Sequence, residues 1–197
     1  MKSVPVAFAV RALLWLPPSF VLWYVLAPWH ASIAAAFARV WLALLAPGLV
    51  VAVERTGATL DFVTTLRFEP VAGHEAVLVP QAGALIYTYG LALLIALMMA
   101  ARARWWKILA GAALLLPFQG WGLALDLLAQ VGIGLGPDVA LQAGIADWRR
   151  EAIALGYQLG SVILPSLMPV MAWAILCRPF IEELVQREPG MARPAPG

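Results

Sequence analysis

The chain has 197 residues, of which 63% are hydrophobic and 12% charged, with a formal net charge of +2 and a mean hydropathy of +0.86. A soluble domain carries about 25% charged residues, so this composition excludes one and predicts an integral membrane protein whose first partner is the lipid bilayer. The small net charge gives no basic stripe and excludes nucleic acid as a partner. One cysteine and two histidines exclude an intrachain disulfide and a Cys-rich or His-rich metal site, and no cofactor is expected.

Residues 1–29 are predicted to form the first transmembrane helix. Lys2 and Arg11 precede an apolar run over residues 12–29. No small-residue cleavage site follows the run directly, so we interpret it as a retained span and not as a signal peptide. The pair Pro17 and Pro18 is expected to kink it.

Residues 30–47 have a one-sided pattern. The large apolar residues fall on one face of a helix, whereas Ala35 and Arg39 fall on the opposite face. A helix with one apolar face is typical of the membrane surface, so we predict an amphipathic interfacial helix with Arg39 in water. A transmembrane hairpin that includes residues 30–53 is the alternative.

Residues 48–81 change to the period of a β-strand. Residues 50–54 are short and β-branched, residues 60–69 alternate between apolar and polar positions, and residues 76–79 form a third apolar run. We predict a small β meander of two or three strands. Its unpaired edges cannot lie in hydrocarbon, so it is expected in the periplasm.

Residues 82–131 are predicted to hold transmembrane helices 2 and 3, joined by a short loop with Arg102, Arg104 and Lys107. A glycine-rich periplasmic linker over residues 132–150 leads to transmembrane helix 4 over residues 151–177, and residues 178–197 form a cytoplasmic tail. The predicted fold class is therefore a membrane all-α bundle of four transmembrane helices, with an interfacial amphipathic helix and a small periplasmic β meander.

The basic residues predict the orientation. With four spans and both termini cytoplasmic, the 13 basic residues divide into eight inside and five outside, as the positive-inside rule prefers. The five outside are Arg39, Arg55, Arg67, Arg149 and Arg150. A five-span arrangement places six on each side and is therefore less favoured.

Asp126 is the one acidic residue near the outer end of the third span, and an ionisable group at such a depth needs a partner. The structural interpretation pairs it with Arg149 or Arg150 at the start of the fourth span. The functional interpretation makes it part of a proton relay or substrate site.

Further polar and small residues are predicted to hold the third and fourth spans together. Gln119 is expected to meet Gln158 at a matching height, and Ser161 is expected to bond to another helix. On a helical wheel, Gln158 falls on one stripe with Glu151, Pro165 and Pro169, which is expected to face other helices. The small pair Gly156 and Gly160 predicts close helix packing.

No catalytic residue is predicted. His30 and His74 have no acid or nucleophile at a recognisable spacing, and Cys177 lies at the cytoplasmic end of the last span. The chain carries no phosphate-binding glycine loop, no HExxH and no GxSxG motif.

Four stretches resemble the family of exosortase H-associated membrane proteins. They are RALLWLPPSFVLWYVLAPW, QAGALIYTYGLALLIALMMA, LLPFQGWGLALDLLAQ and, above all, WRREAIALGYQLGSVILPSLMPVMAW. The resemblance implies a bacterial inner-membrane companion of an exosortase, a membrane enzyme that processes C-terminal sorting tails. It carries over no catalytic residue. An exosortase resembles Cys/Arg enzymes with an extracytoplasmic active site, and the lone Cys177 is expected on the opposite side.

Two hypotheses about function remain. The first is a non-enzymatic accessory protein that docks to an exosortase or its substrate through the face bearing Gln158, Gly156 and Gly160. The second is a small transporter or intramembrane enzyme that uses Asp126, Gln119 and Gln158. A transporter is expected to show internal repeats or charges at the membrane midplane, and the sequence shows neither.

Overall fold

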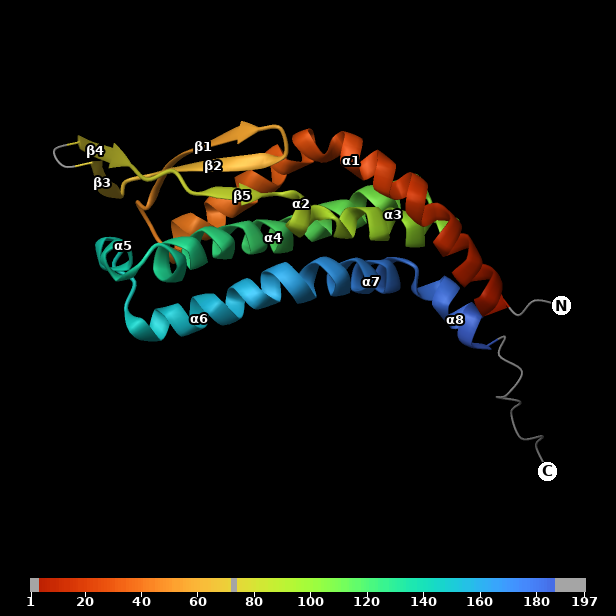
Figure 1. Cartoon of the computed structure of the whole chain (residues 1–197). Helices are drawn as coiled ribbons and strands as arrows, with labels where there is room; N and C mark the ends of the chain where they lie inside the picture. Colours follow the sequence, from red (N-terminus) through yellow and green to blue (C-terminus); the bar gives the residue numbers. More distant parts are fainter. Residues whose placement is uncertain (1–3, 72–73, 187–197) are drawn as a thin grey trace, which may run out of the picture.

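The computed structural model describes residues 4–71 and 74–186 (Figure 1). The structure is mostly helical, with long apolar helices lying side by side and a small β-sheet covering part of them (Figure 1). We call the end with the strands and α5 the sheet end. The opposite end, with the turn that carries Arg102 and Arg104, is the basic end.

The first helix, α1, runs over Val4–Leu45 and is 42 residues long, or about 63 Å at 1.5 Å per residue. It continues through residue 29, where the sequence predicts a boundary between a span and an interfacial helix. Pro28 lies inside it with Pro17 and Pro18, and an apolar helix tolerates such prolines when neighbouring groups satisfy the freed carbonyls. Ser32 Oγ donates to Pro28 O at 3.4 Å.

In the second half of α1, the small residues face the rest of the protein. Ala31, Ala34, Ala35, Ala38 and Leu42 are buried, whereas the larger Ile33, Val40 and Leu44 are 50%, 59% and 70% exposed. Of the two residues predicted on the water side, Ala35 is therefore buried, whereas Arg39 is exposed. The short side chains let α1 approach α4 closely, and the large ones remain on the outside.

Two short helices follow the strands. They are α2 (Leu85–Thr88) and α3 (Gly90–Ala100), which lead to the basic end. The next helix, α4 (Trp105–Ala129), returns to the sheet end and passes into a π-helix, η1 (Gln130–Gly134). These four helices lie within or just beyond residues 82–131, where the sequence predicts transmembrane helices 2 and 3.

The last third of the chain is one interrupted helix with short flanking helices. It comprises α5 (Pro137–Gln142), α6 (Asp147–Gln158), a second π-helix η2 (Leu159–Ile163), α7 (Leu164–Leu176) and α8 (Arg178–Gln186). The predicted linker over residues 132–150 therefore contains α5 and the first turn of α6.

Three segments among the described residues are long and apolar enough to cross a membrane. They are Pro5–Leu45, Trp105–Gly134 and Asp147–Leu176. The apolar helix Leu85–Ala100 is shorter, about 24 Å long, whereas a span usually needs about 20 residues. The structure thus supplies three long candidates for the four predicted spans.

The π-helix η2 breaks the predicted polar stripe. Pro165 and Pro169 are buried, but Glu151 and Gln158 are exposed. A π-helix holds more residues per turn than an α-helix and so rotates everything after it relative to the 3.6-residue wheel. The prediction that these four residues share one inward face is wrong for that reason.

The strands form two small antiparallel sheets. The larger has the order β1-β2-β5, with β1 at Val50–Thr56, β2 at Thr59–Thr64 and β5 at Gln81–Gly83. The smaller pairs β3 (Arg67–Val71) with β4 (His74–Val77). The predicted three-run pattern is thus present, but with five strands.

The single strand predicted over residues 60–69 is two strands. Leu66 N donates to Thr64 Oγ1 at 3.2 Å, and Thr65 N donates to Leu49 O at 2.9 Å, so these amides leave the regular ladder. The predicted alternation holds across the break, because Leu60, Phe62, Thr64 and Leu66 are all buried.

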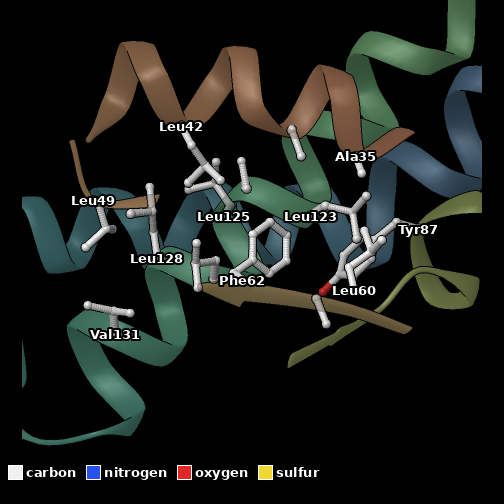
Figure 2. Packing of buried hydrophobic residues seen from close by; sticks show 14 of the residues in the cluster. Ala35, Leu42, Leu49, Leu60, Phe62, Tyr87, Leu123, Leu125, Leu128 and Val131 are labelled. Atoms are coloured by element: carbon white, nitrogen blue, oxygen red, sulfur yellow. The ribbon is translucent and has the colours of Figure 1, made fainter. Parts of the chain in front are cut away.

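The inner face of the larger sheet packs directly on helices. Figure 2 shows Leu60 and Phe62 of β2 pointing toward Leu42 of α1 and Leu123 of α4, and all four belong to one buried cluster. Leu60, Phe62 and Leu123 are fully buried, and Leu42 is 2% exposed. The sheet is therefore part of the same folded unit as the ends of α1 and α4.

Candidate functional site

The main polar cluster lies where α4 meets the start of α2 and the strand β5. Asp126 of α4 and Gln130, the first residue of η1, are one helical turn apart, and Gln130 Nε2 donates to Asp126 Oδ1 at 3.2 Å. The same amide nitrogen donates to Gln81 O of β5 at 2.9 Å. The buried Tyr87 hydroxyl is the second hydrogen-bond partner of the Asp126 carboxyl and also interacts with Tyr157 of α6. These contacts tie α4 to the sheet, to α2 and to α6.

The predicted ion pairs between Asp126 and the two arginines are wrong. Arg149 Nη2 donates to Leu45 O at 2.6 Å, at the last residue of α1. A helix C-terminus leaves carbonyl groups without partners and carries partial negative charge, so a guanidinium is well placed there. Arg150 instead pairs with Asp147, with Nη1 at 3.4 Å from Oδ1.

The predicted contact between Gln119 and Gln158 is also wrong. Gln119 is 5% exposed, and its Oε1 lies 2.8 Å from His30 Nε2 of α1. Gln158 is exposed and makes no hydrogen bond to another described residue. It lies two positions from both Gly156 and Gly160, which puts it about 200° around the helix from the face that they present.

His30 was not among the residues predicted to hold the helices together. The structure places it inside α1, where it forms the polar contact with Gln119. Its neighbours at helical spacing, Ala27, Ala31 and Ala34, are all buried. This run of small residues was the signal that residue 30 faces another helix.

Ser161 bonds to its own helix and not to a neighbour. Its Oγ donates to Tyr157 O at 2.8 Å. Ser166 behaves in the same way, with Oγ at 3.1 Å from Val162 O. Both hydroxyls satisfy carbonyl oxygens around η2 and Pro165, where the regular backbone pattern is interrupted.

Gly156 and Gly160 lie against α4. A Cβ atom at Gly160 would come within 2.8 Å of Gly122 Cα, and one at Gly156 within 3.0 Å of Leu125 Cδ1. Trp121 Nε1 of α4 donates to Gly156 O at 3.2 Å. Because α4 covers this face, the hypothesis that the two glycines offer a docking surface is wrong.

A small cavity lies beside the polar cluster, lined by Tyr87, Gln119 and apolar residues of α3, α4 and α7. Its volume is about 10 Å³, which is room for about one water molecule. It is too small to hold a transported solute next to Gln119.

Cys177 lies at the basic end, far along the molecule from Asp126. The residue is 4% exposed, and its thiol donates to Met98 Sδ at 3.5 Å. Next to it, Lys107 Nζ donates to Leu176 O at 2.7 Å, so the carbonyl of the last residue of α7 has a hydrogen-bond partner. Among the described residues, no three His, Cys, Asp or Glu side chains gather into a group that could hold a metal ion.

The sequence model of the family described as exosortase H-associated membrane protein matches residues 2–180. No curated protein and no solved structure matches the chain. Because the family model covers most of the chain, this protein belongs to the exosortase H-associated membrane protein family.

Proposed function

We propose that this member of the exosortase H-associated family is a non-enzymatic accessory protein of C-terminal protein sorting, which acts by docking to a partner membrane protein. The family match over residues 2–180 is the observation that carries the proposal. The family description associates this protein, which has long apolar helices, with the exosortase system.

The proposed arrangement is a multi-pass protein of the bacterial inner membrane with four spans and both termini cytoplasmic. In Figure 1, α1 and α4 run from the basic end to the sheet end, and α3 and α6–α7 run back. An even number of passes leaves both termini at the basic end. The division of basic residues, eight against five, supports placing that end in the cytoplasm.

The length of α1 supports placing the sheet in the periplasm. At about 63 Å, this helix is twice as long as the hydrocarbon core of about 30 Å, so about half of it lies outside the core. Because the predicted apolar run begins at residue 12, roughly the last third of the helix extends past the core on the far side. The sheet packs on this last part, against Ala34, Ala35 and Leu42. Open sheet edges are tolerated in water and not in lipid.

The contacts of the candidate chemical groups support a structural role. Asp126 receives hydrogen bonds from neutral partners that join α4 to the sheet, and Gln119 joins α4 to α1. Cys177 is buried against Met98 at the opposite end. The cavity beside Gln119 holds about one water, which argues against the transporter alternative.

We place the docking surface on the outer face of α1. Trp29, Ile33, Val40 and Leu44 are 63%, 50%, 59% and 70% exposed, and their spacings of four, seven and four put them on one face. We call this set the α1 stripe. Its second half extends past the hydrocarbon core in the proposed arrangement, where exposed apolar surface marks an interaction site.

The test is co-purification of the full chain with the exosortase from membranes. We expect the double variant Val40→Gln and Leu44→Gln to lose most of the exosortase while keeping its own abundance. Val51→Gln is the matched control, because Val51 is 63% exposed but lies on β1, off the stripe. Unchanged recovery with the double variant would refute the docking surface.

A second variant tests the non-enzymatic part of the proposal. Cys177→Ala removes only a buried thiol at the basic end, so processing of a tail-bearing substrate should continue at the wild-type rate. Processing is followed by the mobility of the substrate on gels. Complete loss of processing at a normal level of the variant would instead indicate an enzyme.

A further inference from the structure

A groove runs between the second half of α1 and the strand β1, on a different face of α1 from the α1 stripe. Two pockets of about 140 and 150 Å³ lie along it, and Arg39 lines both. A cavity of about 150 Å³ accepts a group the size of benzene, so each pocket has room for a side chain. We call this feature the α1–β1 groove, and its lining residues that matter here are Ala36, Arg39, Ala43, Val50, Val53 and Arg55.

The strand beside the groove is an open edge of the larger sheet. The order β1-β2-β5 makes β1 and β5 the two edges, and Figure 1 shows β1 as the strand farthest from α4. The edge at β5 is covered, because Gln130 Nε2 donates to Gln81 O. Among the described residues, the backbone–backbone hydrogen bonds of β1 all go to β2. An open edge of this kind can pair with an extended segment of another chain.

The strand register shows which backbone groups of β1 face the open edge. Phe62 N of β2 donates to Pro80 O at 2.9 Å, on the side of β2 that faces away from β1. In an antiparallel pair, two opposite residues direct their backbone groups either both toward each other or both away. Val53 lies opposite Phe62, and Arg55 lies opposite Leu60, two positions along β2. The N–H and C=O groups of Val53 and Arg55 therefore point out of the open edge.

The side chains of the same two β1 residues face the groove. Opposite residues of a strand pair share one face of the sheet, and Leu60 and Phe62 are buried on the face that packs against α1. Val53 is half-buried on this face, and Arg55 lies on it at an exposed position. The Nη1 of Arg55 donates to Gly57 O at 3.1 Å, which leaves its other N–H groups available.

The charge of the groove is positive. Arg39 is exposed and bonds to no other described residue. Together with Arg55 it gives the groove two guanidinium groups, and no acidic side chain of the described residues lines either pocket. Glu54 of β1 falls on the opposite face of the sheet, because successive side chains alternate. Carboxylates are the groups that complement such a groove.

The dimensions of the groove fit a short strand. The β1 residues along it run from Val50 to Arg55, or about 17 Å at about 3.3 Å per residue. An added strand of five or six residues would cover this length and direct every second side chain into the groove. Pairing with β1 of a second copy is disfavoured, because the Arg55 of that copy would add a like charge.

We propose that the α1–β1 groove binds an extended acidic stretch of a partner protein, which adds to β1 as a further strand. The backbone of this stretch pairs with Val53 and Arg55, and its carboxylates accept hydrogen bonds from the guanidinium groups of Arg39 and Arg55. In the proposed arrangement, the groove lies past the hydrocarbon core, on the periplasmic side. The site does not require the exosortase, so failure of the docking proposal leaves it standing.

The test is fluorescence anisotropy of a labelled eight-residue peptide with alternating glutamate and threonine, added to the full-length chain in neutral detergent at low salt. The wild type should bind this peptide. A peptide with glutamine in place of glutamate should bind at least tenfold more weakly, and one with lysine should not bind. The glutamate peptide with N-methyl groups on alternate amides should also fail to bind, because it cannot add to a strand edge.

Three kinds of variant test the residues of the groove. Arg39→Gln and Arg55→Gln should each weaken binding about tenfold, as expected for loss of a charge-assisted hydrogen bond. Val53→Pro removes an N–H that points out of the open edge, and an edge strand tolerates such a proline, so binding should fall while the unfolding midpoint stays near that of the wild type. Ala36→Phe narrows the groove without changing a charge and should also weaken binding.

Arg104→Gln is the matched control, because Arg104 is an exposed arginine at the basic end, and this variant should bind the peptide like the wild type. Wild-type binding by folded Arg39→Gln and Val53→Pro proteins would overturn the proposal. Equal binding of the glutamate, glutamine and N-methylated peptides would also overturn it. The same holds if the chain binds phosphatidylglycerol but no peptide, or forms a dimer and binds no peptide.

Discussion

The two buried clusters of this protein are built from different elements. At the sheet end, large side chains fill the space between β2 and the ends of α1 and α4, with Phe62, Leu60 and Leu123 all at 0% exposure. In the helix bundle toward the basic end, the buried residues come from α1, α3, α4 and the end of α7, and α3 contributes Leu94 and Met98 together with Ala92, all at 0% exposure. Large residues there often point outward, and Leu14 of α1 is 70% exposed.

In the proposed arrangement, the two clusters also lie in different solvents. Where water surrounds a protein, burial of large apolar side chains stabilises the fold, at about 25 cal/mol per Å² of apolar surface. In lipid that gain is missing, because the tails are as apolar as leucine, and helices associate through close backbone approach and hydrogen bonds. Among the described residues, strand side chains enter only the sheet-end cluster, which fits the proposal that this end stands in water, because open sheet edges are not tolerated in lipid.

The largest expected effect is at the sheet end. Phe62→Ala removes a fully buried ring between the sheet and the helices and should cost about 3–5 kcal/mol of folding free energy. Thermal unfolding of the purified chain in detergent measures it. Phe68→Ala is the control, because Phe68 of β3 is 41% exposed and its loss should cost far less. Equal destabilisation by both variants would contradict the packing of Phe62 between the sheet and the helices.

An intermediate effect is expected in the bundle. Gly160→Val puts side-chain atoms against the backbone of Gly122 and should cost about 1–3 kcal/mol through overpacking. Gly83→Val is the matched control, since a Cβ at Gly83 meets no atom within 4 Å. Unfolding midpoints of the two variants give the comparison. A Gly160→Val protein as stable as the wild type would mean that close approach to α4 does not hold α6 and η2 in place.

The smallest effect is expected at the polar cluster that joins the two regions. Asp126→Asn keeps an oxygen for Gln130 Nε2, whereas Asp126→Leu leaves the amide with only Gln81 O. Hydrogen bonds between membrane helices contribute about 0.6 kcal/mol and at most about 1.7, so Asn should be tolerated better than Leu. Accumulation and substrate processing measure this. Complete loss of processing by both variants, with abundant folded protein, would point to proton chemistry at Asp126.

Local patterns in the sequence predict the elements of this fold well. The alternation around Leu60 and Phe62 predicts the strand and its buried face, and the apolar runs predict the long helices. The local hydrogen bonds and the π-helix that interrupt these patterns were not predicted. The hydroxyl of Thr64 splits one predicted strand into β2 and β3, and η2 rotates the last helix.

The partners of the polar residues were much harder to predict. Arg149 bonds to Leu45 O, 104 positions away, and His30 bonds to Gln119, 89 positions away. No local period carries such information, because it depends on which helix end comes to lie beside which side chain. The predicted pairing of Asp126 with the arginines rested on the depth of these residues along antiparallel helices. A matching depth limits the number of possible partners but does not identify the partner.

The central claim is that the sheet end lies outside the cytoplasm and the basic end inside it. Single-cysteine labelling in a Cys177→Ser background tests this most directly. Thr65→Cys, at an exposed position beside the sheet, should react with a membrane-impermeant thiol reagent in cells whose outer barrier is opened and whose inner membrane is intact. Arg102→Cys, at the exposed basic turn, should react only after the inner membrane is permeabilised. The reverse pattern, with Thr65→Cys protected and Arg102→Cys labelled, would contradict the account.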